Sequence, residues 1–309
     1  MDEPSKGLDP RARDRLADLL LAHLDGGGLL LTITHDLRLA RRLGGDVLVM
    51  REACVVEAGT AGQVLTAGAH PYTRRLLGAE PSRWDFPWMR RGAAPAATGA
   101  PLVAAHGITK SYGAGDLFCD LSLQIHPGER WAFTGPSGAG KTTLGNALLR
   151  LTPVDAGTVV HAAATRGGRV QKLYQDPGLS FPRRVPLEVT VRAAMRRHGV
   201  PGARLAALLE QVGIAPEMLR RRPDQVSGGE LQRIAIVRAM LPRPVLLFAD
   251  EATSRLDVAT QQVTTDVLVR EVDEAGCALL LVTHDDDLAA AVADRRLELP
   301  ARGRAAAPA

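Results

Sequence analysis

The chain has 309 residues, enough for one large or two modest domains, and its 46% hydrophobic and 23% charged residues are typical of a folded globular protein. The net charge of +4 is small and the arginine pairs are scattered, which argues against a nucleic-acid partner. Cys54, Cys119 and Cys277 lie far apart without a CxxC pattern, so neither a disulfide framework nor a metal cluster is expected. No segment approaches the roughly 18 consecutive apolar residues that a membrane helix needs. We therefore expect a cytosolic chain whose membrane-spanning part, if it has one, is another polypeptide.

An internal repeat is visible from the first residues onward. The segment 2–9 aligns without a gap on the segment 250–257, and both begin with Asp-Glu and end with Leu-Asp. In each copy a helical pattern follows, and then an apolar strand that ends in Thr-His-Asp, at 34–36 and at 283–285. Residues 1–90 are therefore predicted to be the C-terminal part of a domain whose complete copy occupies 102–300.

The first copy lacks everything upstream, because Met1 stands where the last residue of the preceding strand should be. Three interpretations stay open: two chains pair through their complete copies, a separate polypeptide provides the missing part, or the start codon is placed too late in an extended or decayed gene. The position of Met1 inside a strand favours the third. Residues 91–101 are rich in Pro, Ala and Gly, which predicts a linker, and 301–309 are expected to be a disordered tail.

The complete copy has the pattern of an α/β domain with a parallel core. A strand at 131–135 leads through a Gly-rich turn into a helix, and the apolar runs 245–250 and 278–283 are typical of strands covered on both faces. Helical patterns at 230–241 and 258–275 lie between or beside them. Residues 187–222 predict a helical insertion.

The Gly-rich turn matches G-x-x-x-x-G-K-[ST] between a strand and a helix, the context that a phosphate-binding loop requires. Backbone N–H groups of such a loop converge on phosphates, Lys141 would reach the β- and γ-phosphates, and the Thr142 hydroxyl would ligate Mg²⁺. The candidate ATP-binding residues of this loop are Gly135, Pro136, Ser137, Gly138, Ala139, Gly140, Lys141, Thr142 and Thr143.

Two carboxylates end the apolar strand at 245–250. Asp250 is assigned to Mg²⁺, and Glu251 is assigned as the general base that takes a proton from the attacking water. The alternative interpretation is that both are ordinary acidic residues on an exposed turn. Their position directly after a buried apolar strand argues against it.

With these residues in place, nearly the whole chain resembles the ATP-binding cassette (ABC) ATPases. The most specific match is the signature-like segment at 226–233, whose Ser227, Gly228, Gly229 and Glu230 would contact the γ-phosphate held by another cassette. The resemblance also implies roles for four single residues. Tyr112 would stack on adenine, Gln175 would touch Mg²⁺ and water, Asp257 would lie at the dimer seam, and His284 would contact the γ-phosphate.

The chain departs from the family pattern at three places. Glu230 replaces a common Gln, Ala252 replaces the usual Pro, and only 34 residues separate Lys141 from Gln175, so the strands between them should be abbreviated. The segment 67–81 resembles the C-terminal part of ATPases that serve peptide and nickel importers.

The resemblance implies an ATP-hydrolysing motor subunit of a peptide, nickel or related small-solute importer, with ATP and Mg²⁺ as cofactors. It would lie peripherally at the cytoplasmic face of the cell membrane. Its expected partners are membrane permease subunits, a second cassette (a homodimer or the missing N-terminal segment) and, indirectly, an extracytoplasmic solute-binding protein. A soluble ABC ATPase without a transport role and a non-catalytic remnant are the alternatives.

Overall fold

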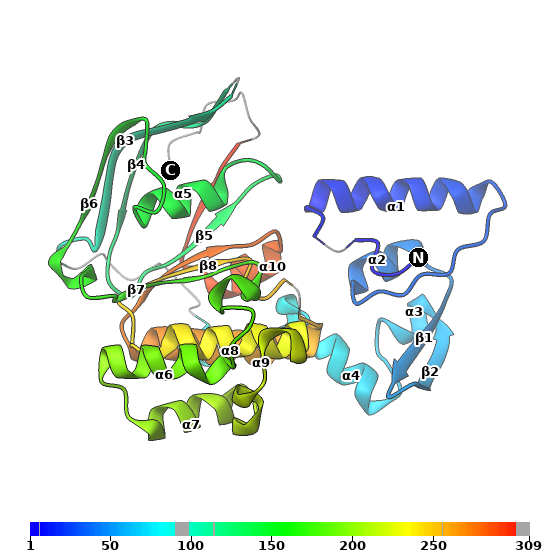
Figure 1. Ribbon diagram of the computed structural model, residues 1–309. Coiled ribbons are helices and arrows are strands. Elements are labelled where there is room, and N and C mark those ends of the chain that lie inside the picture. The colour runs from blue at the N-terminus through cyan, green and yellow to red at the C-terminus, as the bar shows by residue number, and fades with distance from the viewer. Residues whose placement is uncertain (6, 90–98, 114, 255, 301–309) are drawn as a thin grey trace. The chain divides into compact units, whose positions relative to one another are not determined.

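The computed structural model describes residues 1–5, 7–89, 99–113, 115–254 and 256–300 (Figure 1). Two compact units emerge from the contacts within the chain. Unit 1 comprises Met1–Asp85 and Leu256–Gln262, and unit 2 comprises Phe86–Arg255 and Val263–Ala309. Most of the expected linker and all of the expected tail lie outside the described residues.

Helices and strands alternate along most of the described chain. The helices are α1 (Pro10–Asp25), α2 (Leu37–Leu43), α3 (Ala61–Val64), α4 (Pro71–Gly78), α5 (Lys141–Leu148), α6 (Leu187–His198), α7 (Gly202–Gln211), α8 (Gly228–Met240), α9 (Val258–Glu274) and α10 (Asp286–Val292). The strands are β1 (Asp46–Arg51), β2 (Cys54–Thr60), β3 (Val103–Tyr112), β4 (Gly115–Ile125), β5 (Arg130–Thr134), β6 (Ala156–His161), β7 (Val170–Leu173), β8 (Leu246–Asp250), β9 (Ala278–Val282) and β10 (Arg295–Glu298).

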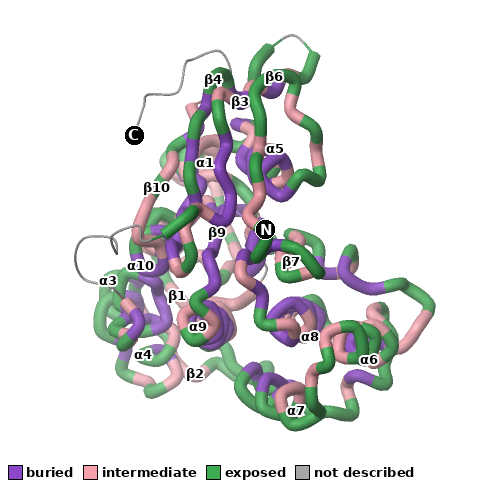
Figure 2. Tube along the Cα trace, turned by 90° about the vertical axis from the view of Figure 1, so that its left-hand side faces the viewer, coloured by how far each residue is buried: buried purple, intermediate pink, exposed green. Residues whose placement is uncertain are grey.

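A parallel sheet forms the centre of unit 2, in the strand order β10-β5-β9-β8-β7. Every residue of β5, β8 and β9 is buried, and Figure 2 shows β9 buried along its length. Helix α5 lies on one face of this sheet and helices α8 and α9 on the other (Figure 1). The predicted α/β fold with a parallel core is confirmed, since continuous apolar strands need a helical layer on both faces.

A second, antiparallel sheet in the order β4-β3-β6 belongs to the same unit and was not predicted from the sequence. Its apolar residues share one core with α5 and the parallel sheet; the members include Ile108, Ile125, Phe133, Leu144 and Phe248. This core fixes the start of α5 against two sheets at once.

The segments that follow the phosphate-binding loop are of the types that the sequence predicts. Strands β6 and β7, which follow α5, have only 6 and 4 residues, as the short spacing to Gln175 predicts. Helices α6 and α7 form the predicted helical insertion. Helix α5 ends at Leu148, and the chain turns at Arg150, which has φ 57°.

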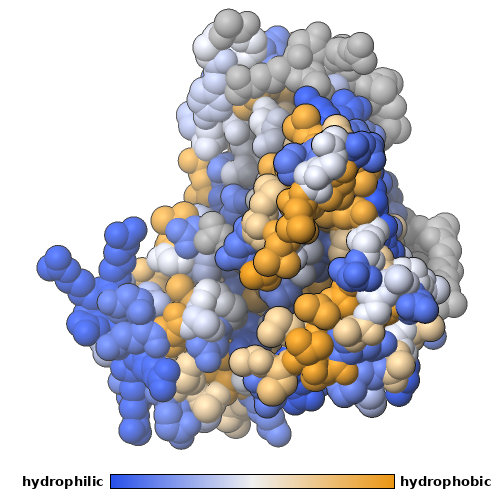
Figure 3. Space-filling view, turned by 90° about the vertical axis from the view of Figure 1, so that its right-hand side faces the viewer, coloured by the Kyte–Doolittle hydropathy of each residue, from blue (hydrophilic) through white to orange (hydrophobic). Residues whose placement is uncertain are grey.

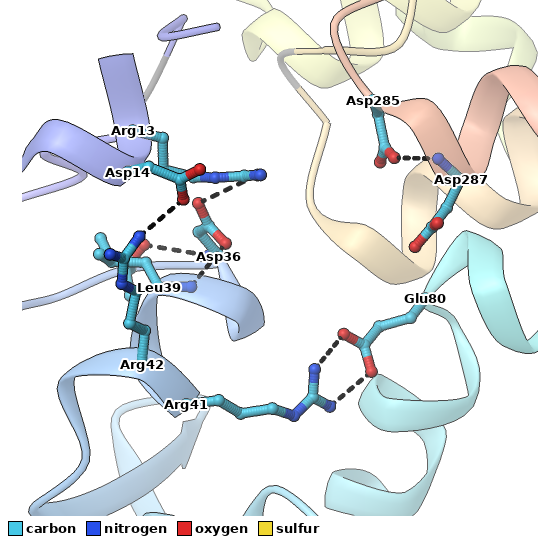
Figure 4. Close-up of polar contacts among 10 residues, drawn as sticks. Arg13, Asp14, Asp36, Leu39, Arg41, Arg42, Glu80, Asp285 and Asp287 are labelled. Atoms are coloured by element: carbon cyan, nitrogen blue, oxygen red, sulfur yellow. Dashed lines mark hydrogen bonds and ion pairs between the residues drawn. The ribbon is translucent and has the colours of Figure 1, made fainter. Parts of the chain in front are cut away.

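Unit 1 contains α1, α2 and the β1–β2 hairpin, with a small core of Val49, Ala61, Val64, Leu65 and Leu77. Arg41 on α2 donates to both carboxylate oxygens of Glu80, each at 2.6 Å (Figure 4). These hydrogen bonds to Glu80 are the main reason that the pKa of Arg41 is raised. On the other side, Arg42 joins α2 to α1 through Asp14 and Asp18.

The apolar strand predicted before Thr34 is present only as an isolated parallel bridge between Asp2 and Ile33. The prediction of a regular strand at this position is therefore wrong. Its backbone meets a partner on one side only, at residues 1–3, and the side chains of Leu29, Leu31 and Ile33 are 87%, 75% and 63% exposed. Hydrophobic side chains gather in patches on the face seen in Figure 3.

Among the helices that the structure describes, none has the length and apolar character needed to cross a bilayer.

Candidate functional site

The phosphate-binding loop connects β5 to α5 and is shaped by its own backbone. Gly138 has φ +77°, and no atom lies within 4 Å of the position that a Cβ would take, so the loop leaves open space next to its backbone. Lys141 is only 5% exposed, and its Nζ donates to the carbonyl oxygens of Gly135 and Pro136, both at 2.8 Å. A buried ammonium at a helix N-terminus with open backbone beside it fits a phosphate group.

Thr142 and Asp250 meet where α5 faces the end of β8. The Thr142 hydroxyl donates to Asp250 Oδ1 at 2.8 Å, and Asp250 is 6% exposed. Burial raises the pKa of Asp250, while the hydrogen bond from Thr142 and the charge of Lys172 oppose the rise. A hydroxyl beside a carboxylate is an oxygen donor set of the kind that Mg²⁺ prefers, so these residues fit the ion.

The described residues contain no group of three or more His, Cys, Asp or Glu side chains that could hold a metal by themselves. A cation at Thr142 and Asp250 would therefore take most of its other ligands from water and from phosphate oxygens, which is the usual situation for Mg²⁺.

Lys172 is a member of this site that the sequence analysis did not identify. From β7 its Nζ donates to Asn146 Oδ1 on α5 at 2.7 Å and lies 3.7 Å from Asp250 Oδ2. The ammonium also lies 4.8 Å from the ring centroid of Tyr174 and 5.1 Å from that of Phe248. Burial lowers the pKa of Lys172, and the charge of Asp250 partly offsets this effect. The available signal was a lysine three positions before Gln175, which the sequence analysis had placed at the site.

Glu251 is held by two side chains from other strands. Its Oε2 accepts a hydrogen bond from Gln175 Nε2 at 2.7 Å, and its Oε1 lies 2.6 Å from His284 Nε2. The Glu251 side chain is 12% exposed and that of His284 is 17% exposed. Residues that are 76 and 33 positions apart from Glu251 are thereby brought to one carboxylate.

All these side chains lie at one edge of the parallel sheet. The phosphate-binding loop follows β5, Gln175 follows β7, Asp250 and Glu251 end β8, and His284 follows β9. Because β5, β9, β8 and β7 are parallel neighbours, their carboxyl ends meet at the same edge, where ligands of such folds bind.

The signature-like residues begin α8 and form a capping box. Ser227 is the N-cap, and its hydroxyl accepts the N–H of Glu230 at 3.3 Å, while Glu230 Oε2 accepts the N–H of Ser227 at 2.8 Å. The N–H and the hydroxyl of Ser227 both donate to Glu230 Oε2, and these two hydrogen bonds lower the pKa of Glu230. Glu230 in place of Gln therefore suits the cap, and Gly228 and Gly229 form the first turn without side chains.

The two remaining predicted residues, Tyr112 and Asp257, make other contacts. Tyr112 ends β3 with 48% of its surface exposed, and Lys110 Nζ lies 5.1 Å from its ring centroid. Lys110 itself is paired with Asp155 at 2.7 Å. Asp257 belongs to unit 1, where its carboxylate accepts the N–H of Thr260 at 3.0 Å in the first turn of α9.

The fold and the site define this part of the chain as an α/β domain with a phosphate-binding loop. A model of the family described as "ABC transporter" matches residues 118–254. The chain is similar to the glutathione import ATP-binding protein GsiA of Escherichia coli (strain K12), at 31% identity over 331 residues. The same protein of Pectobacterium atrosepticum is 30% identical over the same length.

Both alignments cover 92% of this chain and 53% of the relative, so the chain spans about half the length of the curated relatives it matches. Among solved structures, the ATP-binding cassette MJ0796, a dimer bound to ADP and Pi, matches with a TM-score of 0.57 and 24% identity. This match covers 64% of our chain and 94% of MJ0796. An ATP-binding subunit of an ABC transporter matches with a TM-score of 0.56 and 23% identity, covering 65% of our chain and 89% of that one. These likenesses support the same fold.

Proposed function

We propose that this chain is the ATP-hydrolysing motor subunit of an ABC importer for peptides, nickel or a related small solute. The observation that carries the proposal is the contact of Gln175 and His284 with the two oxygens of Glu251, beside the Thr142–Asp250 pair. The name of the similar protein GsiA, a glutathione import ATP-binding protein, favours an importer of small peptides.

In this proposal Lys141 and the N–H groups of the loop bind the phosphates, and Thr142 with Asp250 holds Mg²⁺, which would neutralise charge on the phosphate oxygens. Glu251 accepts the proton of the attacking water. Gln175 and His284 keep its carboxylate in one orientation, so the oxygen that receives the proton is set before the nucleotide binds. Tyr112 offers its exposed ring to the adenine.

A second cassette would complete the ATP site. The helix N-terminus at Ser227 is exposed and could face a γ-phosphate bound elsewhere, as the dimeric state of MJ0796 suggests. Asp257 would lie at that seam. Permease subunits would then convert the cycle of closing and reopening into transport at the cytoplasmic face of the membrane, with a solute-binding protein acting outside.

We also propose that residues 1–90 are the C-terminal part of a further cassette. The main-chain and histidine contacts of Glu3 repeat those of Glu251. The N–H of Glu3 donates to Ile33 at 2.8 Å as that of Glu251 does to Val282 at 3.0 Å, and the two glutamates have φ 46° and 49°. His35 lies 3.6 Å from Glu3 as His284 lies 2.6 Å from Glu251.

The exposed apolar side chains of unit 1 support the same proposal. By the repeat, Leu29, Leu31 and Ile33 correspond to Ala278, Leu280 and Val282. The latter three are buried in the core shared with α5 and the antiparallel sheet. The phosphate-binding half of a cassette would therefore cover the face that Leu29, Leu31 and Ile33 expose. Burying this face would contribute roughly 25 cal/mol per Å² of apolar surface to the free energy of association.

The extent of this first cassette is testable on the protein from its source. It would be purified from detergent-solubilised membranes, and its N-terminal peptide and co-purifying chains identified by mass spectrometry. We expect polypeptide with a strand and phosphate-binding loop, either joined to residue 1 or as a separate chain, together with a polytopic permease. Purification without either would contradict the proposal.

The catalytic assignment is tested by Glu251→Gln. Loss of a general base lowers turnover by about 10²–10⁴, and ATP binding should persist because the loop and Thr142 are unchanged. The matched control is Glu210→Gln, which makes the same change at an exposed glutamate on α7 and should leave ATPase activity unchanged. Turnover of Glu251→Gln at the wild-type rate would refute the role of Glu251.

A further inference from the structure

Lys172 is a buried cation in the layer between the sheet and α5. Its side chain is 10% exposed, and it contacts one amide oxygen, one carboxylate and two aromatic faces. A charged group in such a layer is unfavourable unless it is paired, so the Asp250 carboxylate is the partner that compensates its charge.

The two oxygens of Asp250 have different partners. Oδ1 accepts the hydroxyl of Thr142 at 2.8 Å, and Oδ2 faces Lys172 Nζ at 3.7 Å. Asn146 holds Nζ from the side of α5, which keeps the ammonium near the carboxylate. A divalent cation on Oδ1 would then lie within a few ångströms of a fixed positive charge.

We infer that Lys172 is a built-in counter-ion of Asp250 that competes with divalent cations for this carboxylate. The inference rests on the proposed role of Asp250 as a metal ligand. Like charges in a site of low polarity repel strongly, so the metal alone binds weakly. Phosphate oxygens add negative charge to the site, so the cation binds well only together with the nucleotide.

The test measures Mn²⁺ binding to the full chain without nucleotide, because Mn²⁺ takes the same oxygen ligands and its free form is read by electron paramagnetic resonance. In Lys172→Met an unbranched apolar side chain of similar length takes the place between the two rings. We expect the Mn²⁺ dissociation constant to fall at least about tenfold, which corresponds to about 1.4 kcal/mol.

The matched control is Lys110→Met, which removes another buried lysine that is paired with an aspartate and lies against a tyrosine ring. It makes the same change in net charge and should leave the Mn²⁺ dissociation constant unchanged. Adding Asp250→Asn to Lys172→Met should abolish the gain. If Lys172→Met fails to fold, Lys172→Gln keeps a hydrogen-bonding group near Asn146 and should show the same gain.

An unchanged or weaker affinity in the folded Lys172 variant, or a gain that survives Asp250→Asn, overturns the inference. The proposed function is judged separately by binding of Mg·ATP to the wild-type chain. Failure of that binding would refute the proposed function, whereas normal Mg·ATP binding with no gain in Mn²⁺ affinity would refute the counter-ion role alone.

Discussion

Gly145→Ala is a single methyl substitution whose effect can be worked out from the packing under α5. A Cβ at Gly145 would lie 2.1 Å from Phe248 Cζ and 2.4 Å and 2.6 Å from its two Cε atoms, whereas ordinary contacts are 3.4–4 Å. Phe248 is 0% exposed and in the same core as Leu144 and Leu148, so neither the ring nor the helix has free space. The substitution forces a displacement of more than about 1 Å in a close-packed core.

Overpacking of this kind costs about 1–3 kcal/mol, and the higher helix propensity of Ala returns about 1 kcal/mol. Because the clash falls on a fully buried ring, we take the upper end and expect a net loss of about 2 kcal/mol in the free energy of unfolding. Urea denaturation of the full chain, followed by the fluorescence of its three tryptophans, of which Trp131 lies in this core, measures it. ATP binding should weaken too, since α5 carries Lys141 and Thr142.

Two variants sharpen this test. Phe248→Leu in the Gly145→Ala background shortens the obstructing side chain and should recover part of the loss. Gly202→Ala at the start of α7 makes the same change where no atom lies within 4 Å of the new Cβ, so it should be neutral or stabilising. If Gly145→Ala were also stabilising by the increment that helix propensity alone gives, the packing argument would be refuted.

Two further predictions concern titratable groups. Burial raises the pKa of Cys277 to about 12. A thiol reagent at pH 8 should therefore modify the exposed Cys54 and Cys119 and spare Cys277 in the folded protein. Peptide mass spectrometry measures the labelling of each cysteine, and equal labelling of Cys277 would contradict the argument. The hydrogen bonds from Ser227 lower the pKa of Glu230 in the folded protein. Their contribution to the free energy of unfolding is therefore complete above the pKa of about 4.3 that glutamate has in the unfolded chain, and it is lost as the pH falls through the lower pKa of the folded state. The difference in urea midpoint between wild type and Glu230→Gln, which removes the titrating carboxylate, should therefore be larger at pH 6 than at pH 3, and a difference independent of pH would count against it.

The sequence was most informative where a residue type is tied to one backbone arrangement. The loop before Lys141 predicts a strand, a turn and a helix, and the apolar run before Asp250 predicts a buried strand. The structure contains all of these elements at the predicted positions. The predicted helical insertion follows from periodicity alone. The antiparallel sheet was missed because β3 and β4 carry bulges that break simple alternation, with register shifts near Ile108 and Lys110.

Other features depend on contacts that no local pattern contains. The 3.7 Å approach of Lys172 to Asp250 arises because β7 and β8 are neighbours in the sheet, although they are far apart in the chain. The segment before Thr34 has the composition of a buried strand, but a regular strand forms only where a neighbour supplies a continuous ladder, and here the partner segment extends only over residues 1–3. Composition thus predicts the capacity to form a strand, and tertiary pairing decides whether it forms.

The backbone of Glu251 has φ 49°, a left-handed conformation that an L-residue with a side chain adopts at a cost of about 1–3 kcal/mol and that glycine tolerates freely. Glycine at 251 would relieve this strain while removing the carboxylate that we propose as the general base. Where this relief exceeds the loss of the contacts with Gln175 and His284, a selection of variants for heat resistance alone would favour a protein without the proposed base. Thermal stability and turnover must be screened together in any engineering of this chain, because at this residue they improve in opposite directions.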